Sequence, residues 1–271
     1  MAGLGLSIPE VAGRSRRAPD PATAALIARM TAPPDPARAA LIDAAVRALK
    51  VSGVWAKLDL LYCLAAHDAQ AARLNWIGAS FNLAAVNSPA FTADRGYAGD
   101  GATSYLATGW NPSASAVGFA LNGMSLGAWL NAGTESSSGT AVALGCASAG
   151  TGATLIPRGG SNRIMARANS SGTASSTGSV ATRTGFSAVS RRDGAGAAFH
   201  RGAALDSVIS IAAAALPNSE LFLCGMSSTG SFVNGVDNRI AAAFAGAGLD
   251  AAEMAALHAA FSAYLTGVGG A

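Results

Sequence analysis

The sequence is poor in charge: 12% of its 271 residues are Asp, Glu, Lys or Arg, and the formal net charge is only +3. A net charge this small does not by itself indicate a nucleic-acid partner. Alanine, glycine, serine and threonine are abundant instead, so the surface must consist largely of small, weakly polar side chains. Such a surface suits a component of a particle better than a free cytosolic enzyme.

The sequence also lacks a long hydrophobic run. Its mean hydropathy is +0.34, but no stretch of about 18 apolar residues is free of charges and turn formers, and the positive value comes from alanine. A membrane span is therefore not expected. The first residues, MAGLGLSIPEVAG, have neither the basic start nor the continuous apolar segment of a secretory signal. We therefore expect synthesis and folding in the cytoplasm.

Cysteine and histidine are scarce, with three residues each. Cys63, Cys146 and Cys224 form no CxxC spacing and are odd in number, which indicates neither a zinc site nor a disulfide framework. We expect three buried thiols, because free cysteine behaves as a small hydrophobic residue. The histidines stand apart from one another and from carboxylates at metal-ligand spacing, so they predict no metal site.

Glutamate occurs only at Glu10, Glu135, Glu220 and Glu253. Hydrolysis of a glycan needs two carboxylates across the scissile bond, roughly 5 to 10 Å apart. None of the four glutamates lies two residues from an aspartate on one strand, and Glu253 fits the start of a helix better. A glycoside hydrolase is therefore disfavoured.

The segment Gly123-Met124-Ser125-Leu126-Gly127 has the G-x-S-x-G form of a nucleophile elbow. That motif works only on a strained turn from a strand to a helix, with an aspartate and a histidine following. Here the strand-like SLGAWLNAG follows, and Asp206 and His258 complete a triad only nominally. We expect no esterase and, more generally, no enzyme.

Proline is dense in residues 1–35, which prevents continuous helix or sheet there apart from one short helix at Ala22–Met30. Two interpretations of this Pro-rich N-terminal arm stay open: a disordered tail, and an extended arm that attaches the chain to a neighbouring subunit of a particle. Residues 36–74 predict two amphipathic helices. The first runs from Pro36 to about Gly53, and the second from about Val54 to Ala72, with Trp55, Leu58, Leu61 and Tyr62 at helical spacing.

From Asn75 onward, short apolar or alternating runs are separated by clusters of Gly, Ser and Asn, which is typical of an all-β sandwich. Asp100-Gly101 favours a tight turn before a strand at Tyr105–Thr108. Ten further strands are expected, at 117–122, 125–132, 140–147, 162–168, 179–183, 186–191, 197–201, 207–212, 220–226 and 239–245. The tracts 133–139 and 169–178 are expected to be loops.

A helix is predicted over residues 250–266. Asp250 can cap it, Glu253 three residues later completes a capping box, and Gly267 ends the helix.

Three segments of the chain resemble those of a known protein family. They are LNWIGASFNLAAVNSPAFTADRGYAGDGATSYLATGWNP, the lead-in ALKVSGVWAKLDLLYCLAAHDAQAARLNW and the close NRIAAAFAGAGLDAAEMAALHAAFSAYLTGVG.

These segments resemble the concanavalin A-like (laminin-G-like) lectin domains in structural proteins of tailed phages, prophages and alphaproteobacterial gene transfer agents. The resemblance extends from about Arg38 to the C-terminus. It implies a mainly β, jelly-roll sandwich over residues 75–271, flanked by N-terminal helices and a C-terminal helix. It also implies a non-enzymatic spike, fibre or tail-associated protein of a virion.

The leading functional hypothesis is adhesion to a polysaccharide of the host cell surface. A sugar ring needs an aromatic face with hydrogen-bonding groups nearby, and Trp110, followed by Asn111, is expected on a rim. Trp76 and Trp129 are expected in the core. Candidate contacts on the sheet are basic: Arg163 and Arg167, four apart on a strand, project to one face. If Arg191 joins them, the face suits an acidic polysaccharide, although ordinary solvated arginines remain the alternative.

The basic region is wider than these residues, since seven arginines between positions 158 and 201 are opposed only by Asp193. Single-strand nucleic-acid binders add aromatic stacking platforms to such a region. Its only aromatic residues, Phe186 and Phe199, are expected in the core, so a nucleic-acid partner is not predicted.

Calcium, which laminin-G-like domains commonly bind, needs clustered oxygen ligands. Asp94 and Asp100 are the candidates, but Asp100 equally fits a turn, and we predict no cofactor.

An alternative of a different class is a purely structural base, collar or decoration protein that holds other virion subunits and binds no sugar. Under both hypotheses the chain is assembled in the bacterial cytoplasm and released in the virion on lysis. Other virion structural proteins are then its partners. Spikes and fibres are usually symmetric assemblies, so a homo-oligomer is expected.

Overall fold

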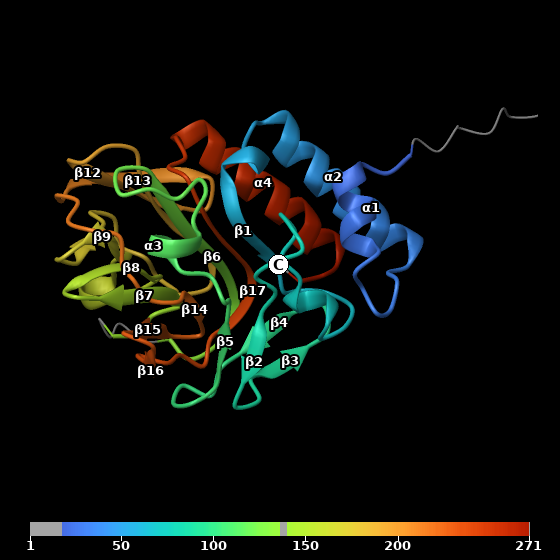
Figure 1. Cartoon of the computed structure of the whole chain (residues 1–271), viewed down its shortest axis with the longest axis horizontal. Helices are drawn as coiled ribbons and strands as arrows, with labels where there is room; N and C mark the ends of the chain where they lie inside the picture. Colours follow the sequence, from blue (N-terminus) through green and yellow to red (C-terminus); the bar gives the residue numbers. More distant parts are fainter. Residues whose placement is uncertain (1–17, 136–139, 271) are drawn as a thin grey trace, which may run out of the picture.

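The computed structural model describes residues 18–135 and 140–270, and it consists of two stacked β-sheets with helices along one side (Figure 1). Sheet A has the order β13-β12-β11-β6-β17-β4-β3, with β1 also paired to β17. Its strands are β1 (Leu58–Cys63), β3 (Ala90–Thr92), β4 (Gly96–Ala98), β6 (Met124–Ala132), β11 (Gly185–Arg191), β12 (Gly196–Arg201), β13 (Ala204–Ser210) and β17 (Arg239–Gly246).

Sheet B has the order β10-β9-β8-β7-β14-β5-β2, with β15 also paired to β7 and β16 paired to β15. Its strands are β2 (Ala84–Val86), β5 (Tyr105–Ala107), β7 (Leu144–Ser148), β8 (Thr151–Ile156), β9 (Met165–Ser170), β10 (Ala174–Ser175), β14 (Phe222–Leu223), β15 (Met226–Ser228) and β16 (Ser231–Val233). The predicted mainly β sandwich with flanking helices, including a C-terminal helix, is confirmed.

The main core lies between the sheets. Alternate side chains of each strand point inward, because successive residues of a strand face opposite sides of the sheet. Leu126 and Leu130 of β6 lie in this core with Leu144 of β7 and Leu155 of β8. The residues between them therefore face outward. Those of sheet A point toward the helices, and those of sheet B point toward the opposite outer surface of the sandwich.

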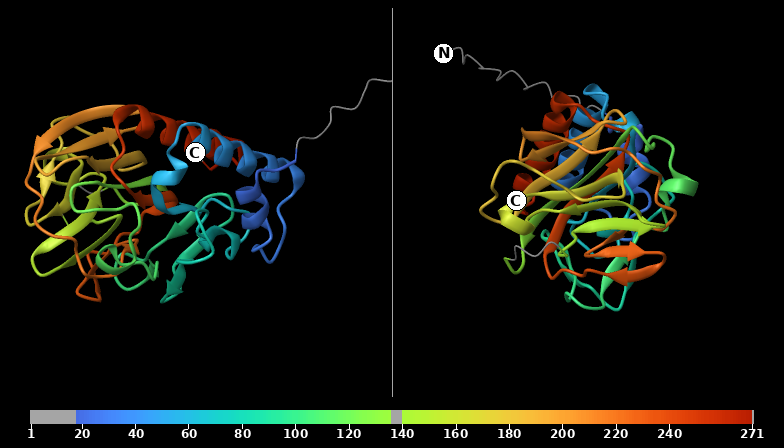
Figure 2. Two further views of the ribbon diagram at one scale, coloured as in Figure 1. Left: turned by 45° about the horizontal axis from the view of Figure 1, so that its top comes forward. Right: turned by 90° about the vertical axis from the view of Figure 1, so that its left-hand side faces the viewer.

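The outer face of sheet A is covered by α2 (Pro36–Val51) and α4 (Ala251–Gly267), which lie side by side (Figure 2). Phe186 and Phe244 on the sheet pack with Phe261 of α4, and the ring of His258 stacks on Trp129 at 5.2 Å. These contacts form a second hydrophobic layer. Among the described residues no helix is long and apolar enough to cross a membrane.

The capping box predicted for the C-terminal helix is present. The Asp250 carboxylate accepts from the Glu253 backbone N–H at 2.9 Å, and the Glu253 carboxylate accepts from the Asp250 N–H at 3.0 Å. Leu249 and Met254 are both buried in the layer beneath the helix. The helix spans Ala251–Gly267, within one residue of the predicted range.

The predicted second helix over residues 54–72 is wrong. This segment contains the short 3-10 helix Trp55–Lys57, then β1, and then the 3-10 helix Ala71–Arg73. The strand β1 is buried on both faces: Leu60 and Tyr62 point into the core between the sheets, while Leu61 and Cys63 point into the layer beneath the helices. Burial on both faces makes a strand continuously apolar, so its sequence also satisfies helical spacing.

Residues 18–35, expected to belong to an arm, pack against the domain instead. The helix α1 (Pro21–Ile27) buries Leu26 in the layer beneath the helices. Arg29 Nη2 donates to the Asn75 carbonyl at 2.7 Å, and Asp20 pairs with Lys50. Residues 1–17, the rest of the predicted arm, lie outside the described residues, so attachment to a particle stays a prediction.

Two of the predicted strands are not strands. Residues 117–122 form a loop because the Asp59 carboxylate accepts from three successive backbone N–H groups, those of Val117, Gly118 and Phe119, at 2.8 to 3.0 Å. Residues 179–183 also form a loop, next to the site described below. The tract 169–178, expected to be a loop, includes the end of β9 and the short strand β10.

The buried residues match expectation at several other positions. All three cysteines are buried and free, and burial raises their pKa values, that of Cys224 to about 12. Trp76 is buried and Trp129 is half-buried against the helix layer, as predicted. A buried histidine was not anticipated: His200 on β12 is 1% exposed, and neither ring nitrogen has a hydrogen-bond partner within the described ranges.

Replacing Phe261 with alanine tests the helix layer. Phe261 contacts two aromatic rings of sheet A, so Phe261→Ala should lower the free energy of unfolding by about 3 to 5 kcal/mol, from lost burial and the cavity left behind. Urea denaturation measures this change. The control is Ala259→Ser at an exposed position of the same helix, and an equal effect of both variants would contradict the assignment.

The buried histidine predicts a pH dependence of stability. Desolvation lowers the pKa of His200 to about 4, whereas an unfolded histidine titrates near 6.5. Between these values only the unfolded chain binds the proton, so the free energy of unfolding should decrease, by up to roughly 3 kcal/mol, as the pH falls from 6.5 to 4.

The variant His200→Phe should lack this component. Denaturation of both proteins across this pH range measures the difference between their free energies of unfolding. The contributions of carboxylates that titrate in both proteins cancel in this difference. NMR titration of the His200 ring provides an independent readout. A ring that titrates near its unfolded value would refute the prediction.

Candidate functional site

The outer face of sheet B differs from that of sheet A, because α2 and α4 lie over sheet A only (Figure 2). Two outward positions on adjacent strands, Gly145 and Gly152, lack side chains. A Cβ atom at Gly145 would lie 2.9 Å from Cγ2 of Thr154, and one at Gly152 would lie 2.9 Å from Cδ of Arg167. These glycines therefore let Thr154 and Arg167 lie across the neighbouring strands.

A hollow of about 260 Å³, here called the sheet B groove, is formed on this face. Its floor is apolar, since Val142, Ala147, Ile156 and Met226 pack into a small hydrophobic cluster. Polar side chains stand around this floor. The whole lining comprises Val142, Ala147, Thr154, Ile156, Arg167, Thr173, Met226, Ser228, Val233 and Asn234.

A larger hollow of about 530 Å³, here called the loop pocket, lies where the loops at one end of the sandwich converge. Its lining comprises Asp100, Gly101, Ala102, Thr134, Thr140, Ala141, Arg183, Asn234, Gly235, Val236 and Asp237. Asn234 lines both hollows, so the sheet B groove and the loop pocket adjoin. We refer to the two together as the cleft.

The loops around the pocket are held by aspartates. Asp100 Oδ1 accepts from the backbone N–H groups of Ala102, Thr103 and Ser104 at 2.7 to 2.9 Å, and these bonds keep the pKa of Asp100 well below its ordinary value. The predicted turn follows, with Gly101 at φ +79°. The Asp237 carboxylate accepts from the backbone and hydroxyl of Thr134. The pocket is therefore preformed by hydrogen bonds between its own loops.

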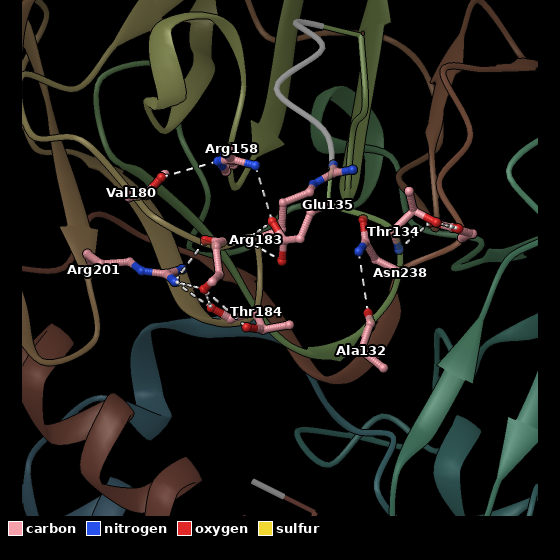
Figure 3. Close-up of polar contacts among 11 residues, drawn as sticks. Ala132, Thr134, Glu135, Arg158, Val180, Arg183, Thr184, Arg201 and Asn238 are labelled. Carbon is pink, nitrogen blue, oxygen red and sulfur yellow. Dashed lines mark hydrogen bonds and ion pairs between the residues drawn. The ribbon is translucent and has the colours of Figure 1, made fainter.

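A buried arginine, Arg183, forms part of the pocket wall. Figure 3 shows its polar contacts with Glu135. Arg183 is 2% exposed and donates from Nη2 to the Ala141 carbonyl at 2.6 Å. Its backbone N–H donates to Glu135, which pairs with Arg158 at 3.3 Å. Burial lowers the pKa of Arg183, opposed by the nearby charges of Glu135 and Asp237. Its Nε has no hydrogen-bond partner in the part of the chain that the structure describes.

Two of the predicted contact residues lie elsewhere. Trp110 was expected on a rim, but it is fully buried between the sheets, with its ring edge-on to Phe119 at 5.4 Å, so the rim position is wrong. The cause is the pairing of β5 with β14, after which the backbone carbonyl of Trp110 accepts from Leu221 N–H at 2.9 Å. Asn111 caps the short helix α3 (Pro112–Ser115) and donates to Asn218 Oδ1. Neither residue lines the cleft.

The three arginines predicted as sugar contacts do not lie together. Arg163 and Arg167 are half-buried while Ile164 and Ala166 are buried, so the predicted common outward face is confirmed. Arg167 lines the sheet B groove, whereas Arg163 Nη1 donates to the Ser176 carbonyl at 2.9 Å. Arg191 does not join them, and that expectation is wrong.

Arg191 is fully buried and donates to the carbonyls of Ala168, Asp193 and Ile211 at 2.7 to 3.1 Å. The wider basic region behaves in the same way. Arg158 donates to the Val180 carbonyl and Arg201 to the Thr184 carbonyl (Figure 3). These guanidinium groups join loops and strands internally, so the seven arginines do not form one exposed basic patch.

The enzymatic alternatives have structural explanations for their residues. Ser125 lies within β6, is buried, and donates from Oγ to the Ala247 carbonyl at 2.7 Å, so the G-x-S-x-G segment is not an elbow. Glu253 completes the capping box of α4, Glu220 accepts from the Gly109 N–H, and Glu135 accepts from the Arg183 N–H.

The candidate calcium ligands are engaged elsewhere as well. Asp94 pairs with Arg38 at 2.6 Å, and Asp100 holds its own loop. Over residues 18–135 and 140–270, no group of three His, Cys, Asp or Glu side chains is placed to hold a metal ion.

The cleft residues Asn234, Asp237 and Arg183 were missed by the sequence reasoning. The only local signal for Asn234 and Asp237 was the segment Asn234-Gly235-Val236-Asp237-Asn238, which is typical of a turn. Nothing in the local sequence of Arg183 distinguishes it from the other arginines.

Comparison with protein-family models and with curated proteins gives no match. Among solved structures, a mutant of HCR/D superposes with a TM-score of 0.52 at 8% identity, covering 76% of this chain and 52% of that one. A mutant of Trypanosoma rangeli sialidase with trans-sialidase activity superposes with a TM-score of 0.50 at 13% identity, covering 83% of this chain and 39% of that one. The chain thus spans about half or less of these two structures, and the likeness shows a shared fold.

Proposed function

We propose that this chain is a non-catalytic carbohydrate-binding module and that the cleft is its binding site. The observation that carries the proposal is the junction at Asn234, where an apolar-floored groove continues into a polar pocket. A sugar chain has the matching chemistry, because its rings expose apolar C–H faces and its rims carry hydroxyl groups. Ligand sites typically combine an apolar lining with a few fixed polar groups in this way.

The polar groups of the cleft are suited to hydroxyl recognition. Thr154 and Thr173 of the groove, and Asn234 between the hollows, offer uncharged donors and acceptors. The shared fold supports the proposal. One structure with this fold is a sialidase, and its name says that it acts on a sugar.

We further propose that the sugar is acidic. Arg167 in the groove and Arg183 in the pocket wall are both cationic, whereas the Asp100 and Asp237 carboxylates already accept hydrogen bonds from their own loops. A carboxylate on the polysaccharide gains charge-assisted hydrogen bonds from Arg167, and the buried charge of Arg183 in the pocket wall attracts it at longer range. No metal cofactor is part of this proposal.

Substitution of Arg167 tests the binding site. Calorimetric titration of the full chain with acidic and neutral bacterial polysaccharides, with and without a chelator, should show saturable binding to the acidic ones. Arg167→Ala and Asn234→Ala should weaken it, the former about tenfold to a hundredfold, since a hydrogen bond to a charged group contributes about 1.5 to 3 kcal/mol.

Arg95→Ala is the matched control, because Arg95 is exposed and does not line the cleft. It removes the same charge and should leave binding unchanged. A folded wild-type chain that binds no polysaccharide at millimolar sugar concentration would refute the proposal, and so would equal losses in Arg167→Ala and Arg95→Ala.

We propose a virion of a phage or gene transfer agent as the setting, with the host surface polysaccharide as ligand and a spike or fibre homo-oligomer as the assembly. The support is the resemblance of the sequence. A structural base, collar or decoration protein is the second candidate. One observation favours it: an apolar furrow of about 400 Å³ between α2 and α4, lined by alanines that include Ala44, Ala48, Ala259 and Ala263, which suits contact with another protein.

Truncation tests the attachment arm. Because α1 packs on the domain, the deletion should stop at residue 17 and keep Asp20 and Leu26. Particles assembled with this truncated chain should lack it, whereas particles assembled with Arg167→Ala should retain it. Immunoblotting of purified particles makes the comparison, and equal incorporation of the truncated and full chains would argue against the arm.

A further inference from the structure

A further hollow lies on the other side of the sandwich, on the outer face of sheet A. The helix α4 contacts the edge strand β13, but outward side chains of this strand stay partly exposed beside the start of the helix. Leu205 and Val208 of β13 are 46% and 66% exposed there. With Ala198 of β12 and with Leu249 at the start of α4 they line a groove of about 270 Å³, here called the edge groove.

His200 belongs to the lining of the edge groove. It is 1% exposed, and both of its ring nitrogens are without a hydrogen-bond partner among the residues that the structure describes. A buried polar group without a partner loses its hydration and gains nothing in return. This side chain is therefore an independent sign that the groove takes a ligand.

Three of the other polar side chains of the lining are already engaged, whereas Arg192 is exposed and makes no hydrogen bond among the described residues. Ser190 Oγ donates to the Leu249 carbonyl at 2.7 Å and accepts from the Leu249 N–H at 2.9 Å. Asp193 accepts from two backbone N–H groups of its own turn, and Asp250 caps α4. Among the buried groups of the lining, the hydrogen-bonding capacity that has no partner is thus concentrated on His200.

The chemistry of the ligand follows from this arrangement. A neutral imidazole offers one donor and one acceptor on different sides of the ring, and a hydroxyl group can pair with either one of them. The charge of Arg192 acts on the Asp193 and Asp250 carboxylates, so the charges of the lining compensate one another and favour a neutral ligand. The walls from Leu205, Val208 and Leu249 favour an apolar body.

We propose that the edge groove binds a small neutral molecule with an apolar body and one hydroxyl group, and that the hydroxyl group is directed at His200. A phenol or a short alcohol has this chemistry. The proposal is independent of carbohydrate binding, because the edge groove and the cleft lie on the outer faces of different sheets.

The test compares 4-methylphenol with toluene, which has the same ring and methyl group but no hydroxyl. NMR titration of the full-length chain follows the ring signals of His200 and gives both dissociation constants. The wild type should bind 4-methylphenol about threefold to tenfold more tightly than toluene, which is the contribution of a neutral hydrogen bond.

Variants separate the hydroxyl contact from the shape of the groove. His200→Phe should keep the affinity for toluene and lose the preference for 4-methylphenol. Ala198→Leu should fill the groove and abolish binding of both compounds. Val117→Leu, at a position that is exposed and outside the groove, is the matched control and should change neither affinity.

Several results would overturn the proposal. They are no saturable shift of the His200 signals with 4-methylphenol, equal affinity of the wild type for the two compounds, and a preference that survives in His200→Phe. Self-association of the chain that Val208→Glu abolishes in light scattering would also overturn it, because a second copy would then occupy the groove.

Discussion

The structure depends on the aromatic layer that joins α4 to sheet A. Phe261 and His258 of the helix pack on Phe186 and Trp129 of the sheet, which buries the outward side chains of one sheet only. A two-sheet sandwich has two outer faces, and this layer closes one of them. Sheet B is left with the open face, and its outward positions are free to form a groove. The location of the cleft is therefore a consequence of how the helices pack.

Few charges are available in this chain, and most arginines of the basic region act inside the fold. Arg191 donates to three backbone carbonyls, and Arg183 and Arg163 each donate to one. Loops between short strands leave carbonyls without ladder partners, and a guanidinium group with five donors can satisfy several of them at once. A cluster of arginines in such a sequence therefore indicates loop fixation before it indicates an anionic partner.

What the sequence predicted correctly was local. The cap at Asp250 and the outward direction of Arg167 depend on residues within a few positions. The fold class, the last helix and one groove residue could therefore be predicted from the sequence. Trp110 and β1 were not, because their burial depends on partners far along the chain: β14 for the former, β17 and the helices for the latter. The cleft could not be derived either, since loops separated by more than 100 residues bring Thr134 to Asp237.

The low charge and the alanine-rich surface of the chain also determine how tightly the proposed site binds a sugar. The cleft offers hydroxyl and amide groups with two cations, without an exposed tryptophan among its lining residues, so each sugar contact is modest. A single site of this kind binds weakly. Linked copies convert later binding events into intramolecular ones and raise the overall avidity by factors of about 10² to 10⁴. A homo-oligomeric spike would thus supply through copy number the affinity that a weakly charged, alanine-rich surface does not supply at one site.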